Sequence, residues 1–153
     1  LKVLQSAARG RGVSAVQPPD RDDDELSRGR ILDHSRAPHN WSPPERPLAR
    51  VDLRHRELNP TCGDELAVSL TLAPDGRVAE VRFEGHGCAI CTAAASMTSD
   101  RIPGRTPAEI AALDRSFVLQ LLGIAIPPLR LRCALLSLKV LQSAALGRPA
   151  GWA

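Results

Sequence analysis

The chain has 153 residues, of which 24% are charged and 3% aromatic, and its formal net charge is +3. This length fits one domain whose core must be built from Leu, Val, Ile and Ala side chains. The arginines are scattered along the chain, which argues against a nucleic-acid partner. Every apolar stretch is shorter than the ~20 residues that a membrane-spanning helix needs, so we expect a soluble protein without membrane contact.

The four cysteines indicate a reducing compartment. Lys2, Gln5 and Arg9 interrupt the N-terminal stretch that would have to stay apolar in a secretory signal. Cysteines without such a leader are typical of proteins in which thiols bind metals or carry sulfur instead of forming disulfides. We therefore expect a cytoplasmic protein.

The N-terminal segment repeats a sequence from the other end of the chain. Residues Leu1 to Ala8 read LKVLQSAA and are identical to Leu138 to Ala145. The first copy is the tail of an upstream tandem copy, a duplication or an artefact, and we expect it to be dispensable. Residues 10–19 predict a linker, because Gly, Ser and a Pro-Pro pair offer neither period nor apolar bulk. We expect a flexible segment over residues 1–21 and one domain over residues 22–153.

The first predicted element of this domain is a helix. Asp22 to Glu25 place four acidic residues where the first turn of a helix favours them, and a short helix over Leu26 to Arg36 follows. Four prolines between Pro38 and Pro47 end the helix and force an extended loop around Trp41.

Strands are predicted next. Residues 50–58 alternate, with Val51 and Leu53 on one face, as in a half-buried strand. A β-hairpin with a turn at residues 73–77 follows, because apolar residues alternate on both sides of the turn: Leu66, Val68, Leu70 and Leu72 before it, and Ala79, Val81 and Phe83 after it. Antiparallel pairing would bring Cys62 and Cys88, at the outer ends of the hairpin, close together.

The second half of the chain predicts helices. The small residues after Cys88 suit a helix packed closely on the sheet, and a capping box at residues 106–109 starts a helix through Leu113. A helix over residues 115–122 stops at Gly123, and the longest helix covers residues 129–146 after a Pro-Pro pair, with Cys133 in its opening turns. These elements predict an α+β fold with a small antiparallel sheet of about three strands packed against several helices.

Three cysteines on separate turns are the candidate functional residues. The segment NPTCGD places Cys62 and Asp64 two residues apart on a turn that Pro60 rigidifies and Gly63 bends. With Cys88 and Cys133 this turn would supply a four-ligand set for Zn²⁺ or an incomplete thiolate cage for an iron–sulfur cluster. The alternative from spacing alone is a group of buried free thiols.

Two further sets of residues are candidates for a functional site. Cys88 and Cys91 form a CxxC pair, as in thiol–disulfide oxidoreductases, but no βαβ pattern surrounds it, and we expect Cys91 to be a small packing residue facing the sheet. The four histidines lie among charged or polar neighbours, which predicts solvated side chains; His86, two residues before Cys88, is the one candidate ligand among His34, His39, His55 and His86.

Five segments resemble, in this order, the U-type iron–sulfur cluster assembly proteins (IscU, SufU and the N-terminal domain of NifU). They are ILDH at 31–34, PHN at 38–40, NPTCGD at 59–64, FEGHGCAI at 83–90 and RCALLS at 132–137. The similarity runs from about Glu25 to Ala145. It implies the SufE/NifU-like (IscU-like) fold, and it implies that Cys62, Asp64, Cys88 and Cys133 are the ligands of a metal or cluster.

The subfamily features are mixed. Arg132 stands where IscU-like members have His, and this residue, the NPTCGD turn and the run from Cys133 to Lys139 resemble SufU. The interval between Cys88 and Cys133 is too short for the extra segment of SufU, and residues 126–130 resemble the Leu-Pro-Pro-Val-Lys motif by which IscU is recognised by an Hsp70-type chaperone. Ser35 replaces the usual Tyr, and Cys91 a common Ser.

The resemblance implies a scaffold or sulfur carrier and not a turnover enzyme. Such a scaffold accepts sulfur from a cysteine desulfurase, binds iron, and transfers a [2Fe–2S] cluster to acceptor apo-proteins. The alternative within the family is a zinc-dependent sulfurtransferase relay of the SufU type, in which Zn²⁺ occupies the same ligands. The alternative from another class is a CxxC thiol–disulfide oxidoreductase.

Cys62 is the predicted persulfide acceptor, because its Pro/Gly turn can swing whereas Cys88 and Cys133 open helices that hold them. Cys133 is the alternative acceptor. A helix N-terminus and the nearby Arg130 and Arg132 would favour a thiolate there. The two arginines could equally dock an acidic desulfurase surface.

Overall fold

The computed structural model describes residues 21–42 and 48–152, with side chains from residue 23 onward. The elements run in the order α1 (Arg21–Arg36), β1 (Leu53–Leu58), β2 (Glu65–Leu72), β3 (Val78–His86), α2 (Ala89–Ser99), α3 (Pro107–Ala111), α4 (Arg115–Leu122), the 3₁₀ turn η2 (Pro128–Arg130) and α5 (Leu131–Leu146). The N-terminal repeat and linker lie outside the described residues, as do three of the loop prolines. No described helix is long and apolar enough to cross a membrane.

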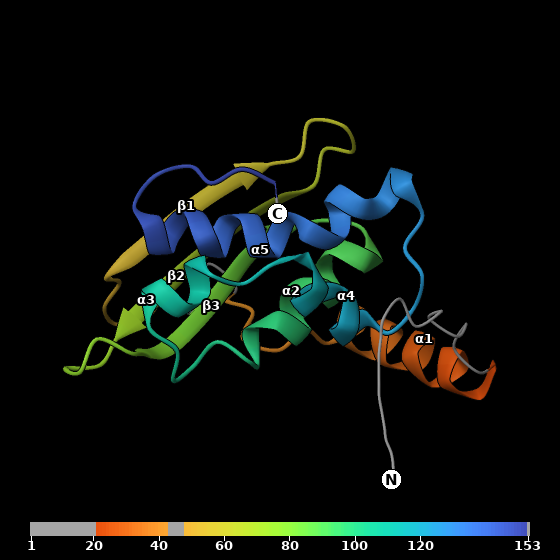
Figure 1. The fold of residues 1–153 in the computed structure, drawn as a ribbon, viewed down its shortest axis with the longest axis horizontal. Helices are drawn as coiled ribbons and strands as arrows, with labels where there is room; N and C mark the ends of the chain where they lie inside the picture. The colour runs from red at the N-terminus through yellow and green to blue at the C-terminus, as the bar shows by residue number, and fades with distance from the viewer. Residues whose placement is uncertain (1–20, 43–47, 153) are drawn as a thin grey trace, which may run out of the picture.

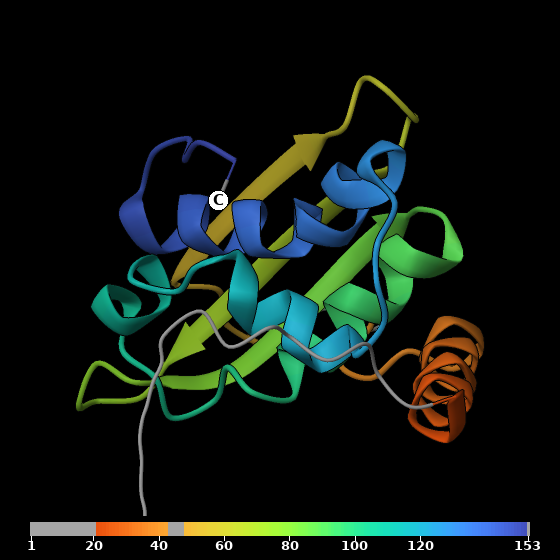
Figure 2. The ribbon, with the colours of Figure 1, turned by 45° about the vertical axis from the view of Figure 1, so that its right-hand side comes forward.

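The sheet has three antiparallel strands in the order β1-β2-β3. Helices α2 to α5 lie on one side of it (Figure 1), where α5 packs on β1 and β2, and α2 packs on β3. α1 stands at the side of the molecule (Figure 2) and packs against α2. The predicted α+β fold is confirmed.

The core forms between the sheet and α5. Val68, Val81 and Phe83 from the strands meet Leu136 and Val140 of α5, and all five side chains are buried. Burying one such side chain stabilises the fold by about 1.5–3 kcal/mol relative to leaving it exposed. This aliphatic packing therefore fixes where α5, and the cysteine in its first turn, lies on the sheet.

The outer edge of β3 is covered by the loop after α1. The Phe83 backbone N–H donates to the Asn40 carbonyl, and the Ser42 N–H donates to the Phe83 carbonyl, both at 2.8 Å. Trp41 thereby makes a parallel bridge with Phe83. The predicted extended loop around Trp41 is confirmed for the residues that are described.

Two strand predictions need correction. β1 begins at Leu53, and Val51 is exposed. Residues 50–52 still contact β2, where the Asp52 carboxylate accepts a hydrogen bond from the Leu72 N–H at 2.7 Å. The pairing register shifts between Thr71 and Leu72. A bulge of this kind reverses the alternation beyond it. Val78 is therefore buried, and Ala79, predicted to face inward, is exposed.

The helices follow their local signals with small differences in length. The capping box is present, since the Thr106 hydroxyl accepts from the Glu109 N–H and the Glu109 carboxylate accepts from the Thr106 N–H, but α3 ends before the predicted Leu113. α4 covers the predicted residues and ends at Gly123 in the left-handed conformation. α1 begins earlier than predicted and includes the acidic residues, whereas the first residues of the predicted last helix form η2.

Gly85 provides a test of the β2–β3 pairing. It has a φ of +129°, and a Cβ there would lie 2.1 Å from the Glu65 carbonyl oxygen. We expect Gly85→Ala to lower the free energy of unfolding by more than about 2 kcal/mol, because both the conformation and the backbone contact oppose a side chain. Urea unfolding measures the change.

The matched control is Gly29→Ala. A Cβ at Gly29, inside α1, meets nothing within 4 Å, so alanine should stabilise the helix by up to ~1 kcal/mol. Equal effects of the two substitutions would contradict the assignment of strain to Gly85.

Candidate functional site

The turn that carries Cys62 is held by one buried residue, Asn59. Its side-chain amide donates to the Cys62 Sγ at 3.0 Å, and its side-chain oxygen accepts from the Thr61 N–H at 3.2 Å. Its backbone donates to the Asp64 carbonyl and accepts from the Gly63 N–H, both at 2.8 Å. Gly63 completes the turn with a φ of +76°. The turn is therefore fixed more firmly than its Pro and Gly residues predicted, and the accessibility of Cys62 comes from its exposed side chain.

Cys62, Asp64 and Cys133 converge in space. Their donor atoms all lie within 4.8 Å of one another, and the two Sγ atoms are 3.3 Å apart. Asp64 is buried; its Oδ1 accepts from the Cys88 N–H at 3.2 Å, and its Oδ2 has no hydrogen-bond partner in the described part of the chain. An unpaired buried oxygen of this kind costs about 1–3 kcal/mol, more if charged, unless a cation or donor meets it.

Cys88 lies beside Cys62, Asp64 and Cys133 but is not one of the residues whose donor atoms converge. It caps the N-terminus of α2, where its Sγ accepts from the Cys91 N–H at 3.5 Å. The β3–α2 connection passes close to the group at Gly87, where a Cβ would lie 3.3 Å from the Asp64 Cγ and 2.7 Å from the Cys91 Sγ. We call Cys62, Asp64, Cys88 and Cys133 together the thiol site.

The structure separates the two arginines near Cys133. The negative charge of Cys88, a hydrogen bond to Cys88 and the charge of Cys133 raise the pKa of Arg130, so this guanidinium faces the thiols. Arg132 instead places its guanidinium carbon 5.1 Å from the centre of the Trp152 ring, on which Lys139 also lies. The position of Arg132 next to Cys133 in the sequence predicts a side chain at the thiol site, but this side chain packs on the C-terminal Trp152 instead.

Cys133 is buried within the first turn of α5. Burial, the hydrogen bond with the Cys62 thiol and the negative charges of Cys88 and Asp64 raise the pKa of the Cys133 thiol well above its usual range. Burial therefore opposes the thiolate expected at this helix N-terminus.

Cys91 is a core residue, as predicted. It is fully buried, and burial is the main cause that raises the pKa of its thiol. A thiol–disulfide oxidoreductase needs an accessible, readily ionised pair, and this structure does not support that function for Cys88 and Cys91.

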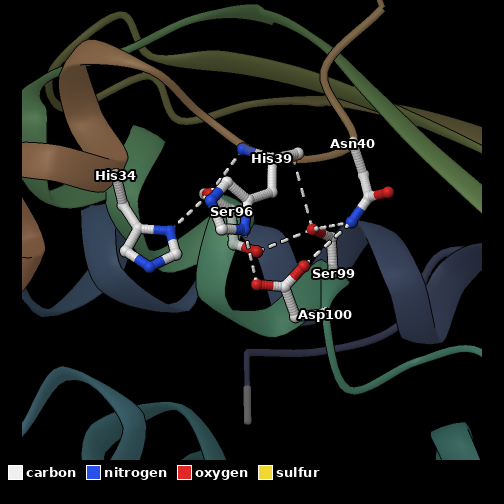
Figure 3. A network of polar contacts seen from close by, with 6 residues as sticks. All are labelled: His34, His39, Asn40, Ser96, Ser99 and Asp100. Carbon is white, nitrogen blue, oxygen red and sulfur yellow. Dashed lines mark hydrogen bonds and ion pairs between the residues drawn. The ribbon is translucent and has the colours of Figure 1, made fainter.

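Two of the four histidines, His39 and His86, are exposed as predicted, whereas His34 and His55 are partly buried. His86 is exposed and pairs across the sheet with Glu65, outside the converging group. His55 is partly buried and contacts Glu57 at 3.0 Å. His34 and His39 meet Asp100 of the α2 C-terminus in a polar cluster (Figure 3). No local signal in the sequence predicts this cluster, because the packing of α1 on α2 creates it.

An open hollow of about 410 Å³ adjoins Cys88. Apolar Ile90, Ile124 and Pro127 line it together with Arg28 and Arg130. Leu129, in the segment 126–130, is 88% exposed beside it. This hollow makes Cys88 approachable from outside, whereas the chaperone contact expected for residues 126–130 stays a prediction.

The donor set suits a thiophilic metal. Tetrahedral Zn²⁺ with Zn–S bonds of 2.3 Å places two thiolates about 3.8 Å apart, so the Cys62 and Cys133 sulfurs at 3.3 Å need only a small separation to accept an ion. The unpartnered Asp64 Oδ2 supplies a further anionic ligand at the same point. Two thiols and a carboxylate also suit the iron of an iron–sulfur cluster.

Comparisons with known proteins agree with the motifs. The family model of the NifU-like N-terminal domain matches residues 26–148. The zinc-dependent sulfurtransferase SufU of Bacillus subtilis is 32% identical over 78% of this chain and 88% of its own length. The iron–sulfur cluster assembly scaffold protein IscU of Streptococcus pyogenes is 30% identical over 74% of this chain and 79% of its own length. The resemblance inferred from the sequence is confirmed.

A solved structure shows the same fold. It is a putative iron–sulfur cluster assembly scaffold protein for the SUF system from Fervidobacterium islandicum AW-1. It aligns with a TM-score of 0.59 at 24% identity, over 76% of this chain and 93% of that one.

Asp64 gives a test of the donor set. We expect Asp64→Ala to weaken Zn²⁺ binding by more than about tenfold, because the variant removes an anionic donor beside Cys62 and Cys133. Competition with a chromophoric chelator measures the affinity. Asp75→Ala, at the exposed hairpin turn, should leave it unchanged, and equal affinities of wild type and Asp64→Ala would exclude Asp64 as a ligand.

Proposed function

The chain belongs to the NifU-like N-terminal domain family, and from this premise we propose that it is an iron–sulfur cluster assembly scaffold. It accepts sulfur from a cysteine desulfurase, binds iron, and transfers a [2Fe–2S] cluster to acceptor apo-proteins. The observation that carries the proposal is the convergence of Cys62, Asp64 and Cys133 around an unpartnered buried carboxylate oxygen.

Cys62, Asp64, Cys88 and Cys133 are the proposed ligands of the cluster, which is the cargo of the protein. Three of them already converge, and Cys88 needs only to turn its side chain from the α2 N-cap toward Asp64, whose carboxylate already bonds its N–H. Arg130 offsets part of the negative charge of the thiolates and cluster. A carboxylate among thiolate ligands is a harder and weaker donor for iron, which suits a cluster that must be released.

Cys62 is the proposed first acceptor of sulfur. Its thiolate attacks the outer sulfur of the desulfurase persulfide, that S–S bond breaks, and the desulfurase cysteine leaves as a thiolate while Cys62 becomes the persulfide. Cys62 is exposed whereas Cys133 is buried, so a large partner reaches Cys62 first. The 3.3 Å between their sulfurs then places Cys133 within reach of the delivered sulfur.

A zinc-dependent sulfur relay is the second candidate function. The same four residues would hold Zn²⁺, and the relative from Bacillus subtilis that matches most of this chain is a zinc-dependent sulfurtransferase. When bound, Zn²⁺ would keep the thiol ligands deprotonated. Cys62 would still be the residue that meets the desulfurase, because its exposure does not depend on the metal.

Reconstitution separates these functions. Anaerobic incubation with iron, cysteine and a desulfurase should give a visible chromophore in wild type, and we expect its loss in Cys62→Ser. Cys91→Ala should keep the colour, because Cys91 is a buried packing residue outside the ligand set. A wild-type protein that stays colourless and retains one zinc would overturn the scaffold proposal and favour the relay.

The two arginines give a matched test of sulfur acceptance. We expect Arg130→Ala to slow persulfide formation by about three- to tenfold, since Arg130 places a positive charge beside Cys88 and Cys133 in the thiol site. Arg132→Ala should have little effect, because Arg132 stacks on Trp152. Labelled cysteine, a desulfurase and peptide mass mapping measure rate and position; label on Cys133 and none on Cys62 at the earliest times would show that Cys62 is not the first acceptor.

A further inference from the structure

A second cluster of metal-ligating side chains lies where α1 meets α2. His34 belongs to the last turn of α1, His39 follows that helix, and Asp100 is the C-cap of α2. One donor atom from each residue lies within 4.8 Å of the other two. Figure 3 shows the two imidazoles facing the end of α2, from which Ser96, Ser99 and Asp100 project.

Each imidazole is held through its Nδ1 atom. The His34 Nδ1 contacts the Ser96 Oγ at 2.6 Å, and the His39 Nδ1 contacts the Asp100 Oδ2 at 2.7 Å. The Ser96 Oγ also accepts from the His39 backbone N–H at 2.7 Å. These contacts fix the orientation of both imidazoles, and an ion bound by His39 and Asp100 would replace the hydrogen bond between them.

Asp100 is itself positioned by neighbours. The Asn40 side-chain amide donates to the Asp100 Oδ1 at 3.2 Å and to the Ser99 Oγ at 2.9 Å. The Oδ2 atom is the one that faces His39. Three segments of the chain thus orient one carboxylate and two imidazoles toward a common point.

The two imidazole rings lie with their centres 4.5 Å apart. Two imidazolium ions at this distance would repel each other, and burial followed by the proximity of His39 lowers the pKa of His34. The lowered pKa favours the neutral imidazole, whose lone pair can bind a metal.

This cluster is separate from the thiol site. Cys88 caps the start of α2 and Asp100 caps its end, and the helix between them has 11 residues. The caps are twelve residues apart in the sequence, so at 1.5 Å per residue they lie about 18 Å apart. An ion at one end of α2 therefore shares no ligand with an ion or cluster at the other.

We propose that His34, His39 and Asp100 bind a divalent transition-metal ion of the class of Zn²⁺, Co²⁺ or Fe²⁺. Two imidazoles and one carboxylate form a donor set that these ions favour and that leaves coordination positions open to water. Bonds of 2.0–2.2 Å place neighbouring donors about 3.4 Å apart. Rotation of the exposed His39 and Asp100 side chains closes the remaining distance. The ion would join the end of α1 to the end of α2.

Anaerobic titration of the full chain with Co²⁺ tests this proposal, because the two sites differ in their spectra. Cobalt bound by thiolates gives an intense sulfur-to-metal absorption band, whereas cobalt bound by His and Asp gives none. We expect wild type to bind two equivalents, counted by elemental analysis after desalting. His39→Gln and Asp100→Asn should each lose one equivalent and keep the thiolate band.

The matched control is His55→Gln, which changes a histidine outside both sites. It should bind two equivalents. Thermal unfolding gives a second readout: Co²⁺ should raise the melting temperature of wild type and of His55→Gln more than that of His39→Gln, because the lost ion no longer joins α1 to α2.

Three results would overturn the proposal. Wild type could bind a single equivalent that gives the thiolate band, or His39→Gln and Asp100→Asn could bind as much as wild type, or His55→Gln could lose the same equivalent. A loss of the thiolate band in wild type would instead contradict the thiol site and leave the histidine site standing, so the two proposals fail separately.

Discussion

The antiparallel pairing of β2 with β3 is the constraint on which the thiol site depends. Glu65 pairs with His86 at the end of the ladder, so the residues that leave the sheet on either side of this pair must emerge next to each other. Asp64 directly precedes Glu65 and Cys88 comes two residues after His86, and the Asp64 carboxylate accepts a hydrogen bond from the Cys88 N–H at this end of the pair. A change of register by one residue would move the carboxylate to the other face of the sheet. The strand pairing therefore brings these two proposed ligands together.

The packing of α5 completes the site and sets its protonation. The contacts that bury Leu136 and Val140 against the strands also carry Cys133 out of water and raise its pKa. Without a bound cation, two thiolates and a carboxylate at this buried site would hold like charges together away from water, which is unfavourable. A bound cation offsets these negative charges, and its binding must be coupled to loss of the Cys133 proton. The contacts between α5 and the sheet therefore both stabilise the fold and place Cys133 where a metal could bind.

Local signals in the sequence predicted local structure well. The capping box at Thr106, the stop at Gly123 and the hairpin all depend on residues near one another in the chain. Long-range contacts were missed. The register shift at Leu72, the contact of Arg132 with Trp152 and the meeting of His34 with Asp100 arise from tertiary packing, which periodicity does not report. The thiol site could be identified because its three motifs are specific, whereas its geometry, with Cys88 set apart, needed the structure.

The three proposed cysteine ligands differ in exposure. Cys133 is buried in the core, and Cys88 is partly buried at a helix cap beside an open hollow. Cys62 is exposed on a turn whose backbone Asn59 fixes, so its thiol can meet a partner while Asp64 stays in place. A scaffold needs this combination, because rigid ligands define the cargo and one accessible ligand receives the sulfur. The carboxylate between them binds iron less strongly than a fourth thiolate would, and that difference favours release to the next protein.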